Sequence, residues 1–133
     1  MKYLLDTNVC IRYLNGRVPK IRERLLALDE DEIAVSIISK AEMFYGSAKS
    51  QTPQRSREKQ EAFLAGVRVL PFDDAAVDQY ALLRVALERQ GKPISHPDMQ
   101  IAAIALANQL VLVTHNTGEF SRIKGLALED WEV

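Results

Sequence analysis

The sequence has 133 residues, of which 47% are hydrophobic and 26% are charged, a balance typical of a soluble globular protein. This length suits one ordinary domain, so we expect residues 1–133 to form a single domain. One cysteine, Cys10, excludes an internal disulfide, and no apolar run is long enough to cross a membrane. We therefore expect a cytoplasmic protein that has no membrane contact.

The net charge of −1 conceals an asymmetry between the two halves of the chain. Residues 1–68 hold 12 Lys and Arg against 9 Asp and Glu, a net charge of +3. Residues 69–133 hold 5 against 9, a net charge of −4. Basic side chains cluster in residues 12–24 and 49–59. Two interpretations stay open: solvated helix faces, or a basic rim that holds phosphates near an acidic centre.

The first half of the chain alternates short apolar runs with helical patterns. The polar triplet Asp6, Thr7 and Asn8 ends the first run and can cap the helix after it, which Asn15 and Gly16 stop. The predicted elements are a strand at 2–6, helices at 9–14 and 19–28, a strand at 33–36, and helices at 39–48 and 52–64.

The second half continues the alternation. It predicts, in order, a strand at 67–70, helices at 73–91 and 97–107, a strand at 110–114, a short helix at 119–122 and an edge strand at 126–128. The helix at 97–107 is apolar nearly all round, so we expect it to be buried. The order of elements predicts an α/β fold, with a mostly parallel central sheet of four to five strands and helices on both faces.

Acidic side chains recur where active sites of open α/β sheets lie, beyond the carboxyl ends of the strands. Asp6 follows the first strand, and Glu42 lies one to two helical turns after the second. Asp98 begins the helix that leads into the fourth strand, and Asn116 and Glu119 follow that strand. We expect the topology to bring these residues to one rim.

Each of these residues also has a structural explanation. Ser-x-x-acid at residues 39–42 and 95–98, and Asn-x-x-Glu at 116–119, match a helix capping box or close variants of it. Asp6 could be the N-cap of the next helix, although it ends a strand that should be buried.

The two interpretations are compatible, because a helix N-terminus stabilises an ionised carboxylate. Several ionised carboxylates in one crevice repel one another, so they need a cation or must take up protons. Hard oxygen ligands select Mg²⁺ or Mn²⁺. A divalent ion held by carboxylates and water is a standard device for phosphodiester cleavage.

Several short motifs follow one another in a specific order. They are Tyr3–Asn8, Ser36–Glu42 with Tyr45-Gly46, Gly91–Ile94 leading to Asp98, Val113–Phe120 and the terminal Glu129–Trp131. Together they make the sequence similar, over essentially its whole length, to the PIN-domain ribonucleases. In particular it resembles the VapC toxins of bacterial type II toxin–antitoxin pairs.

The resemblance implies a PIN fold and an endoribonuclease activity that depends on Mg²⁺ or Mn²⁺. It implies that Asp6, Glu42 and Asp98 are catalytic and bind the metal, with a fourth contribution from the region of Asn116 and Glu119. PIN domains often carry aspartate where Asn116 stands, which favours Glu119 as the fourth ligand. The resemblance also implies a homodimer, a VapB-like antitoxin that covers the active site, and a structured RNA substrate, often the anticodon region of the initiator tRNA.

Other polar residues could support the site. Thr7 and Asn8 adjoin Asp6, Thr114 could donate a hydrogen bond to a carboxylate, and Arg12 could hold a phosphate or be solvated.

Two further hypotheses are kept beside the nuclease. A receiver-like phosphoacceptor domain needs an adjacent acidic pair after the first strand, where this sequence has only Asp6. A catalytically inactive PIN domain would bind the antitoxin without cutting RNA. His96 and His115 flank the predicted site without metal-ligand spacing, so we expect surface or packing roles for both.

Overall fold

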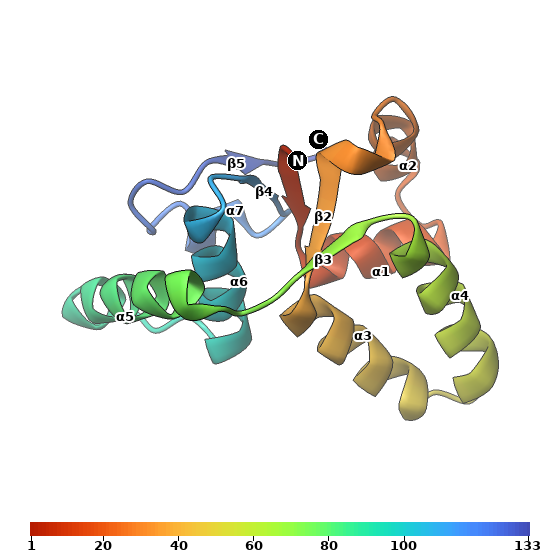
Figure 1. Ribbon diagram of the computed structural model, residues 1–133, viewed down its shortest axis with the longest axis horizontal. Helices are drawn as coiled ribbons and strands as arrows, with labels where there is room; N and C mark the ends of the chain where they lie inside the picture. Colours follow the sequence, from red (N-terminus) through yellow and green to blue (C-terminus); the bar gives the residue numbers. More distant parts are fainter.

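A five-stranded parallel sheet forms the centre of the protein (Figure 1), as described by a computed structural model of residues 1–133. Its strands are β1 (Tyr3–Leu5), β2 (Ile33–Ser36), β3 (Arg68–Leu70), β4 (Val111–Val113) and β5 (Leu128–Glu129). The strand order is β3-β2-β1-β4-β5, and all four pairings are parallel. The predicted parallel sheet is confirmed.

Seven α-helices and one 3₁₀ turn connect the strands. They are α1 (Thr7–Asn15), α2 (Pro19–Leu26), the 3₁₀ turn η1 (Glu30–Glu32), α3 (Ile37–Ala48), α4 (Pro53–Ala65), α5 (Asp74–Arg89), α6 (His96–Ala107) and α7 (Thr117–Phe120). None of the helices combines the length and the apolar character that crossing a bilayer requires.

The sheet separates two apolar cores, because successive strand residues point to opposite faces. Leu4 packs on one face with buried residues of α5 and α6, whereas Tyr3 and Leu5 pack on the other with residues of α1 to α4. Figure 1 shows these two groups of helices on either side of the strands. The predicted burial of the 97–107 segment is confirmed, since residues 101–105 are all buried in α6.

The start of α3 differs from the prediction. The helix begins at Ile37, two residues early, because Ser36 is its N-cap and accepts a hydrogen bond from the Ser39 backbone N–H at 3.0 Å. The capping box expected at residues 39–42 is therefore wrong. Similarly, α7 begins at Thr117 rather than residue 119, and β5 covers Leu128–Glu129 rather than 126–128.

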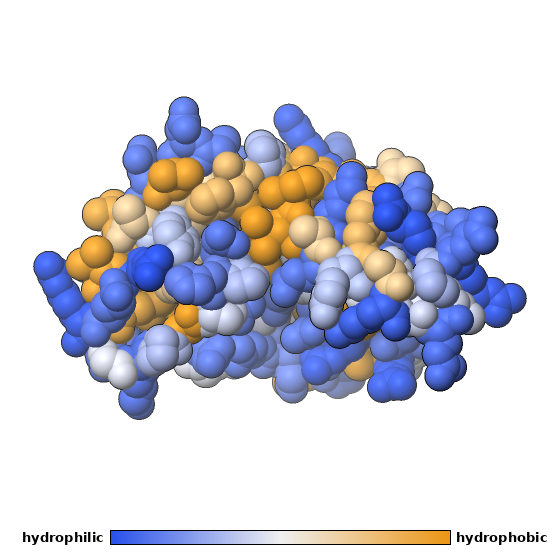
Figure 2. Space-filling model, turned by 90° about the horizontal axis from the view of Figure 1, so that it is seen from below, coloured by the Kyte–Doolittle hydropathy of each residue, from blue (hydrophilic) through white to orange (hydrophobic).

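The parallel arrangement places the carboxyl ends of the strands at one edge of the sheet. Strands β1 and β2 run downward in Figure 1 and lead directly into α1 and α3. Seen from below, hydrophilic side chains cover the lower half of the molecule, and apolar ones gather in the upper half towards the left and centre (Figure 2).

Candidate active site

Asp6 lies at the carboxyl end of β1 and is only 5% exposed. It occupies the N-cap position of α1, but its side chain accepts no capping hydrogen bond. Instead Asp6 Oδ2 accepts a 2.8 Å hydrogen bond from the hydroxyl of Thr114, which follows β4. The interpretation of Asp6 as merely a helix cap is therefore wrong, and the predicted contact of Thr114 with a carboxylate is confirmed.

A chain of hydroxyl groups orients Glu42. Thr7 Oγ1 donates to Glu42 Oε1 at 2.7 Å, so Thr7 accepts in its other contact, a 2.7 Å hydrogen bond from Ser39 Oγ. Ser39 in turn accepts from Ser36 Oγ at 3.3 Å. The chain connects Ser36, the N-cap of α3, to Glu42, six residues further along that helix.

Asp98 lies in the first turn of α6. The helix is capped by Ser95, whose hydroxyl accepts from the Asp98 backbone N–H at 3.3 Å. The predicted Ser95 cap is present.

The acids perturb one another's ionisation. Burial raises the pKa of Asp6, and the charge of Glu42 raises it further, while the Thr114 hydroxyl and the Arg12 charge oppose this rise. Burial is also the main cause that raises the pKa of Asp98 to about 6; the charge of Asp6 comes next, and those of Glu42 and Glu119 add to it. The four predicted acids therefore act on one another at one edge of the sheet.

Asn116 orients the Glu119 carboxylate by a hydrogen bond. Its side-chain N–H donates to Glu119 Oε2 at 2.7 Å, and its backbone N–H donates to Thr114 Oγ1 at 3.0 Å. Asn116 is the N-cap residue of α7 but makes no capping side-chain hydrogen bond, so the expected capping variant is wrong there. Asn8 is exposed, and its side chain makes no hydrogen bond within the protein.

The donor set suits a hard divalent cation. Four carboxylates share the edge, and Arg12 is the one cation that lowers the pKa of Asp6. No three of these acids place their ligand atoms within 4.8 Å of one another. Because Mg²⁺ usually takes one or two carboxylates directly and keeps several water ligands, the other acids would contact such an ion through water.

A compact titratable group lies near this edge, formed by His115, Asp130 and Glu132, whose ligand atoms are within 4.8 Å of one another. Each acid already has a protein partner: Asp130 Oδ2 lies 2.9 Å from His115 Nδ1, and Glu132 Oε2 accepts from Arg12 at 2.5 Å. Arg12 is therefore ion-paired, with a side chain that is 36% exposed. Sequence reasoning missed Asp130 and Glu132, since only the terminal Glu-Asp-Trp motif drew attention to this segment.

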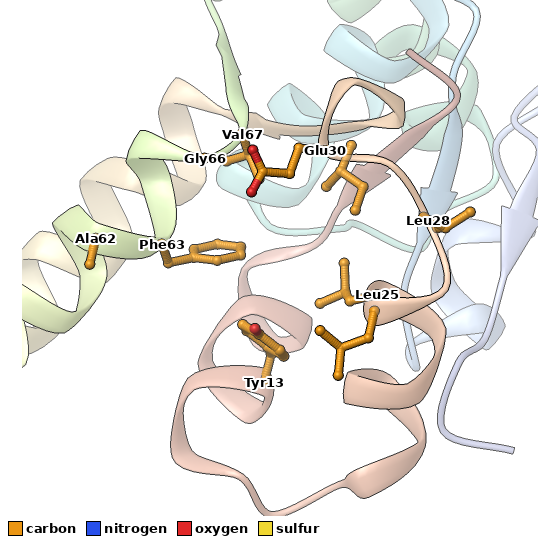
Figure 3. Close-up of a pocket in the computed structure, with 10 residues that line it drawn as sticks. Tyr13, Leu25, Leu28, Glu30, Ala62, Phe63, Gly66 and Val67 are labelled. Carbon is orange, nitrogen blue, oxygen red and sulfur yellow. The ribbon is translucent and has the colours of Figure 1, made fainter.

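An apolar pocket of about 330 Å³ lies elsewhere (Figure 3). Eight of its ten lining residues are hydrophobic, among them Tyr13 from α1, Leu25 from α2 and Phe63 from α4. It also includes Ile33, the first residue of β2, so it lies towards the amino ends of the strands and away from the acids. Glu30 is its one charged residue, which gives it no carboxylate cluster.

The fold, and the four acids at the carboxyl edge of the sheet, agree with a known family. Residues 3–126 match the family model described as PIN domain. The chain belongs to the PIN-domain family.

Individual relatives show which PIN-domain proteins the chain is similar to. The chain is 38% identical over 131 residues to the tRNA(fMet)-specific endonuclease VapC of Shigella flexneri, covering 98% of both chains. It is 36% identical over 133 residues to Ribonuclease VapC2 of Rickettsia felis, covering 99% of both. Within the PIN domains, the predicted similarity to VapC ribonucleases is thereby confirmed.

Solved structures give the same result. The DNA-bound VapBC of Salmonella typhimurium superimposes with a TM-score of 0.93 at 37% identity and covers 98% of both chains. VapBC2 of Rickettsia felis, bound to a DNA fragment from its promoter, gives a TM-score of 0.92 at 36% identity and covers 98% of this chain and 99% of that one.

Proposed function

We propose that this protein is the toxin of a toxin–antitoxin pair and cuts RNA in a reaction that depends on Mg²⁺ or Mn²⁺. One observation carries the proposal. Asp6, Glu42, Asp98 and Glu119 come from four separate segments, and all four contribute to one electrostatic environment at the carboxyl edge of the sheet.

These four acids would hold the cation, which when bound would activate a water and neutralise charge on the scissile phosphate. The protein's own residues prepare the site. Thr114 fixes Asp6, Thr7 fixes Glu42, and Asn116 fixes Glu119 by hydrogen bonds of 2.7 to 2.8 Å. Because three of the four acids are already oriented, binding the cation requires little side-chain ordering.

The relatives support a finer proposal for substrate and partner. One similar protein is named a tRNA(fMet)-specific endonuclease, and the solved neighbours include VapBC complexes. We therefore propose the initiator tRNA as substrate, a VapB-like antitoxin as partner, and a homodimer as the assembled toxin.

The proposal is tested by RNA cleavage with purified, antitoxin-free protein in Mg²⁺ or Mn²⁺. We expect Asp6→Asn to abolish cleavage while circular dichroism and melting temperature show a folded protein. Asp78→Asn, at an exposed acid of α5, is the matched control and should cleave as the wild type does.

EDTA should stop wild-type cleavage, and restored Mn²⁺ should recover it. Cleavage that persists in EDTA, or in Asp6→Asn, would overturn the proposal. A folded wild-type protein that binds the antitoxin but leaves every RNA intact would instead support the inactive PIN domain.

A further inference from the structure

A second cavity lies at the start of α6, the helix that carries Asp98. Its volume is about 390 Å³, and it lies between α5 and the loop that joins α5 to α6. The side chains with polar ends around it include Arg84, Lys92 and His96, with Glu88 as the one acid. Asp98 of the proposed active site also lies in the first turn of α6, two residues beyond His96, but it does not line this cavity.

Hydrogen bonds to Tyr80 orient two of the donors that line the cavity, Arg84 and His96. Arg84 NH1 donates to Tyr80 Oη at 3.0 Å, so the phenol hydrogen is available for His96 Nδ1, 3.1 Å away. In that arrangement the neutral imidazole carries its hydrogen on Nε2, which makes His96 a donor. Phe72 packs edge-on against the Tyr80 ring, with 5.8 Å between the ring centroids, and restrains it.

The loop that carries Lys92 is also tied down. Arg122 donates to Gln90 Oε1 at 3.1 Å and to the carbonyl oxygen of Lys92. No carboxylate lies within 4.0 Å of the Lys92 ammonium, and Glu88 lies at 4.0 Å from Arg84 Nε with a side chain that is 66% exposed. Arg84 and Lys92 thus line the cavity together with one acid, Glu88, whose charge is screened by solvent, so the lining carries a net positive charge.

We propose that this cavity binds a backbone phosphate of the RNA other than the phosphate that is cut. The inference rests on the proposed nuclease function and extends it to a substrate-positioning site. Arg and Lys side chains are the usual partners of RNA phosphates, and Arg84 would contribute fixed N–H donors while Lys92 contributes a point charge. Because His96 of the cavity and Asp98 share the first turn of α6, a phosphate held in the cavity would set the register of the RNA strand relative to the acids.

The test measures RNA binding in the Asp6→Asn background, which keeps the substrate intact. Arg84→Gln and Lys92→Gln should each weaken binding about 3- to 10-fold and reduce the slope of log Kd against log salt by about 0.7, the value for one lost single-strand phosphate contact. Arg89→Gln, an exposed residue of α5 that does not line the cavity, is the matched control for charge. Melting temperatures verify folding, and Lys92, which holds no hydrogen bond through its side chain, provides the variant least able to disturb the fold.

Trimming the RNA identifies the phosphate. Removing nucleotides one at a time from either side of the cut should abolish the difference between Lys92→Gln and its parent once the bound phosphate is gone. In the active enzyme, Lys92→Gln should raise KM and leave kcat unchanged. Effects equal to those of Arg89→Gln, or a difference that survives every truncation, would overturn this inference while leaving wild-type cleavage, and so the nuclease proposal, intact. Weakened antitoxin binding with unchanged RNA binding would also overturn it.

Discussion

The acid residues at the edge of the sheet are held in an environment that opposes their ionisation. Asp6 is nearly inaccessible to solvent and retains one hydroxyl donor, Thr114, on its Oδ2. Asp98 is less buried but faces the charges of three other acids. Charged groups that repel one another lower the free energy of unfolding. The four acids therefore destabilise the folded protein unless a cation or a proton neutralises part of their charge.

Replacing Asp98 should therefore stabilise the metal-free protein. The pKa of Asp98 rises from its ordinary value of 3.8 to about 6 on folding, so the native state holds this proton more tightly than the unfolded state. The associated stability is fully present below pH 3.8 and is lost as the pH rises through 6. In EDTA at pH 7.5, Asp98→Asn should raise the free energy of unfolding by roughly 1–2 kcal/mol, a value reduced for solvent screening of this half-buried group.

Urea unfolding at several pH values measures this change. The gain should shrink towards zero as the pH approaches 3.8, while Asp78→Asn should show no such trend. A gain of the same size at every pH would indicate a packing effect, and a loss at pH 7.5 would contradict the electrostatic explanation.

At the scale of elements, helix starts position the acids. Helix α3 is capped by Ser36, and the same residue begins the hydroxyl chain through Ser39 and Thr7 to Glu42. Helix α4 offers a contrast, because Thr52 stands at its N-cap and makes no capping hydrogen bond. Ser36 thus makes a capping hydrogen bond and Thr52 does not, although both residue types are preferred at the N-cap.

Removing the hydroxyl of Ser36 and removing that of Thr52 should therefore lower the free energy of unfolding by different amounts. Ser36→Ala should lower the free energy of unfolding by about 1–2 kcal/mol, since it removes a buried cap. It should also reduce cleavage, because Ser39 and Thr7 lose part of the support that aims Glu42. Thr52→Ala should cost less than about 0.5 kcal/mol, as an exposed site without a capping bond. Chemical denaturation of both variants checks the difference, and equal losses would count against it.

The sequence patterns could predict the alternation of elements, the parallel sheet and the burial of α6, because these depend on local periodicity. They could also predict where Asp6 and Asp98 lie, since both positions follow from strand and helix ends. They predicted Ser39 instead of Ser36 as the cap of α3, because both are good capping residues and they lie three positions apart. The pairing of Arg12 with Glu132 joins residues 120 positions apart, and no local pattern carries that information.

At the scale of the molecule, the C-terminal segment closes the structure around the site. Trp131 is 1% exposed, its ring packs edge-on against Tyr3 at 5.2 Å, and its indole N–H donates to Glu129. Arg24 of α2 donates to Glu129 at 2.8 Å, while Arg12 of α1 donates to Glu132, three residues beyond Glu129. The first two helices and the last strand thereby form one framework beside Asp6, so a ligand that binds the acids should stabilise the whole fold.

Mn²⁺ should accordingly raise the melting temperature of the protein. A cation that binds the native state alone adds about 2.7 kcal/mol of stability at a concentration 100 times its Kd. For a chain of 133 residues this corresponds to a rise of about 5–10 °C. The rise should weaken as the pH falls below about 6, since protons then compete for Asp98.

Differential scanning calorimetry with and without Mn²⁺ measures the shift, and EDTA should reverse it. Asp6→Asn should lose most of the rise, because it removes the most buried ligand. Asp130→Asn provides the decisive comparison, because Asp130 belongs to the compact group with His115 and Glu132. If Asp130→Asn removed the shift and Asp6→Asn kept it, the cation would bind at the C-terminal group. The four acids at the carboxyl edge would then no longer be the metal site.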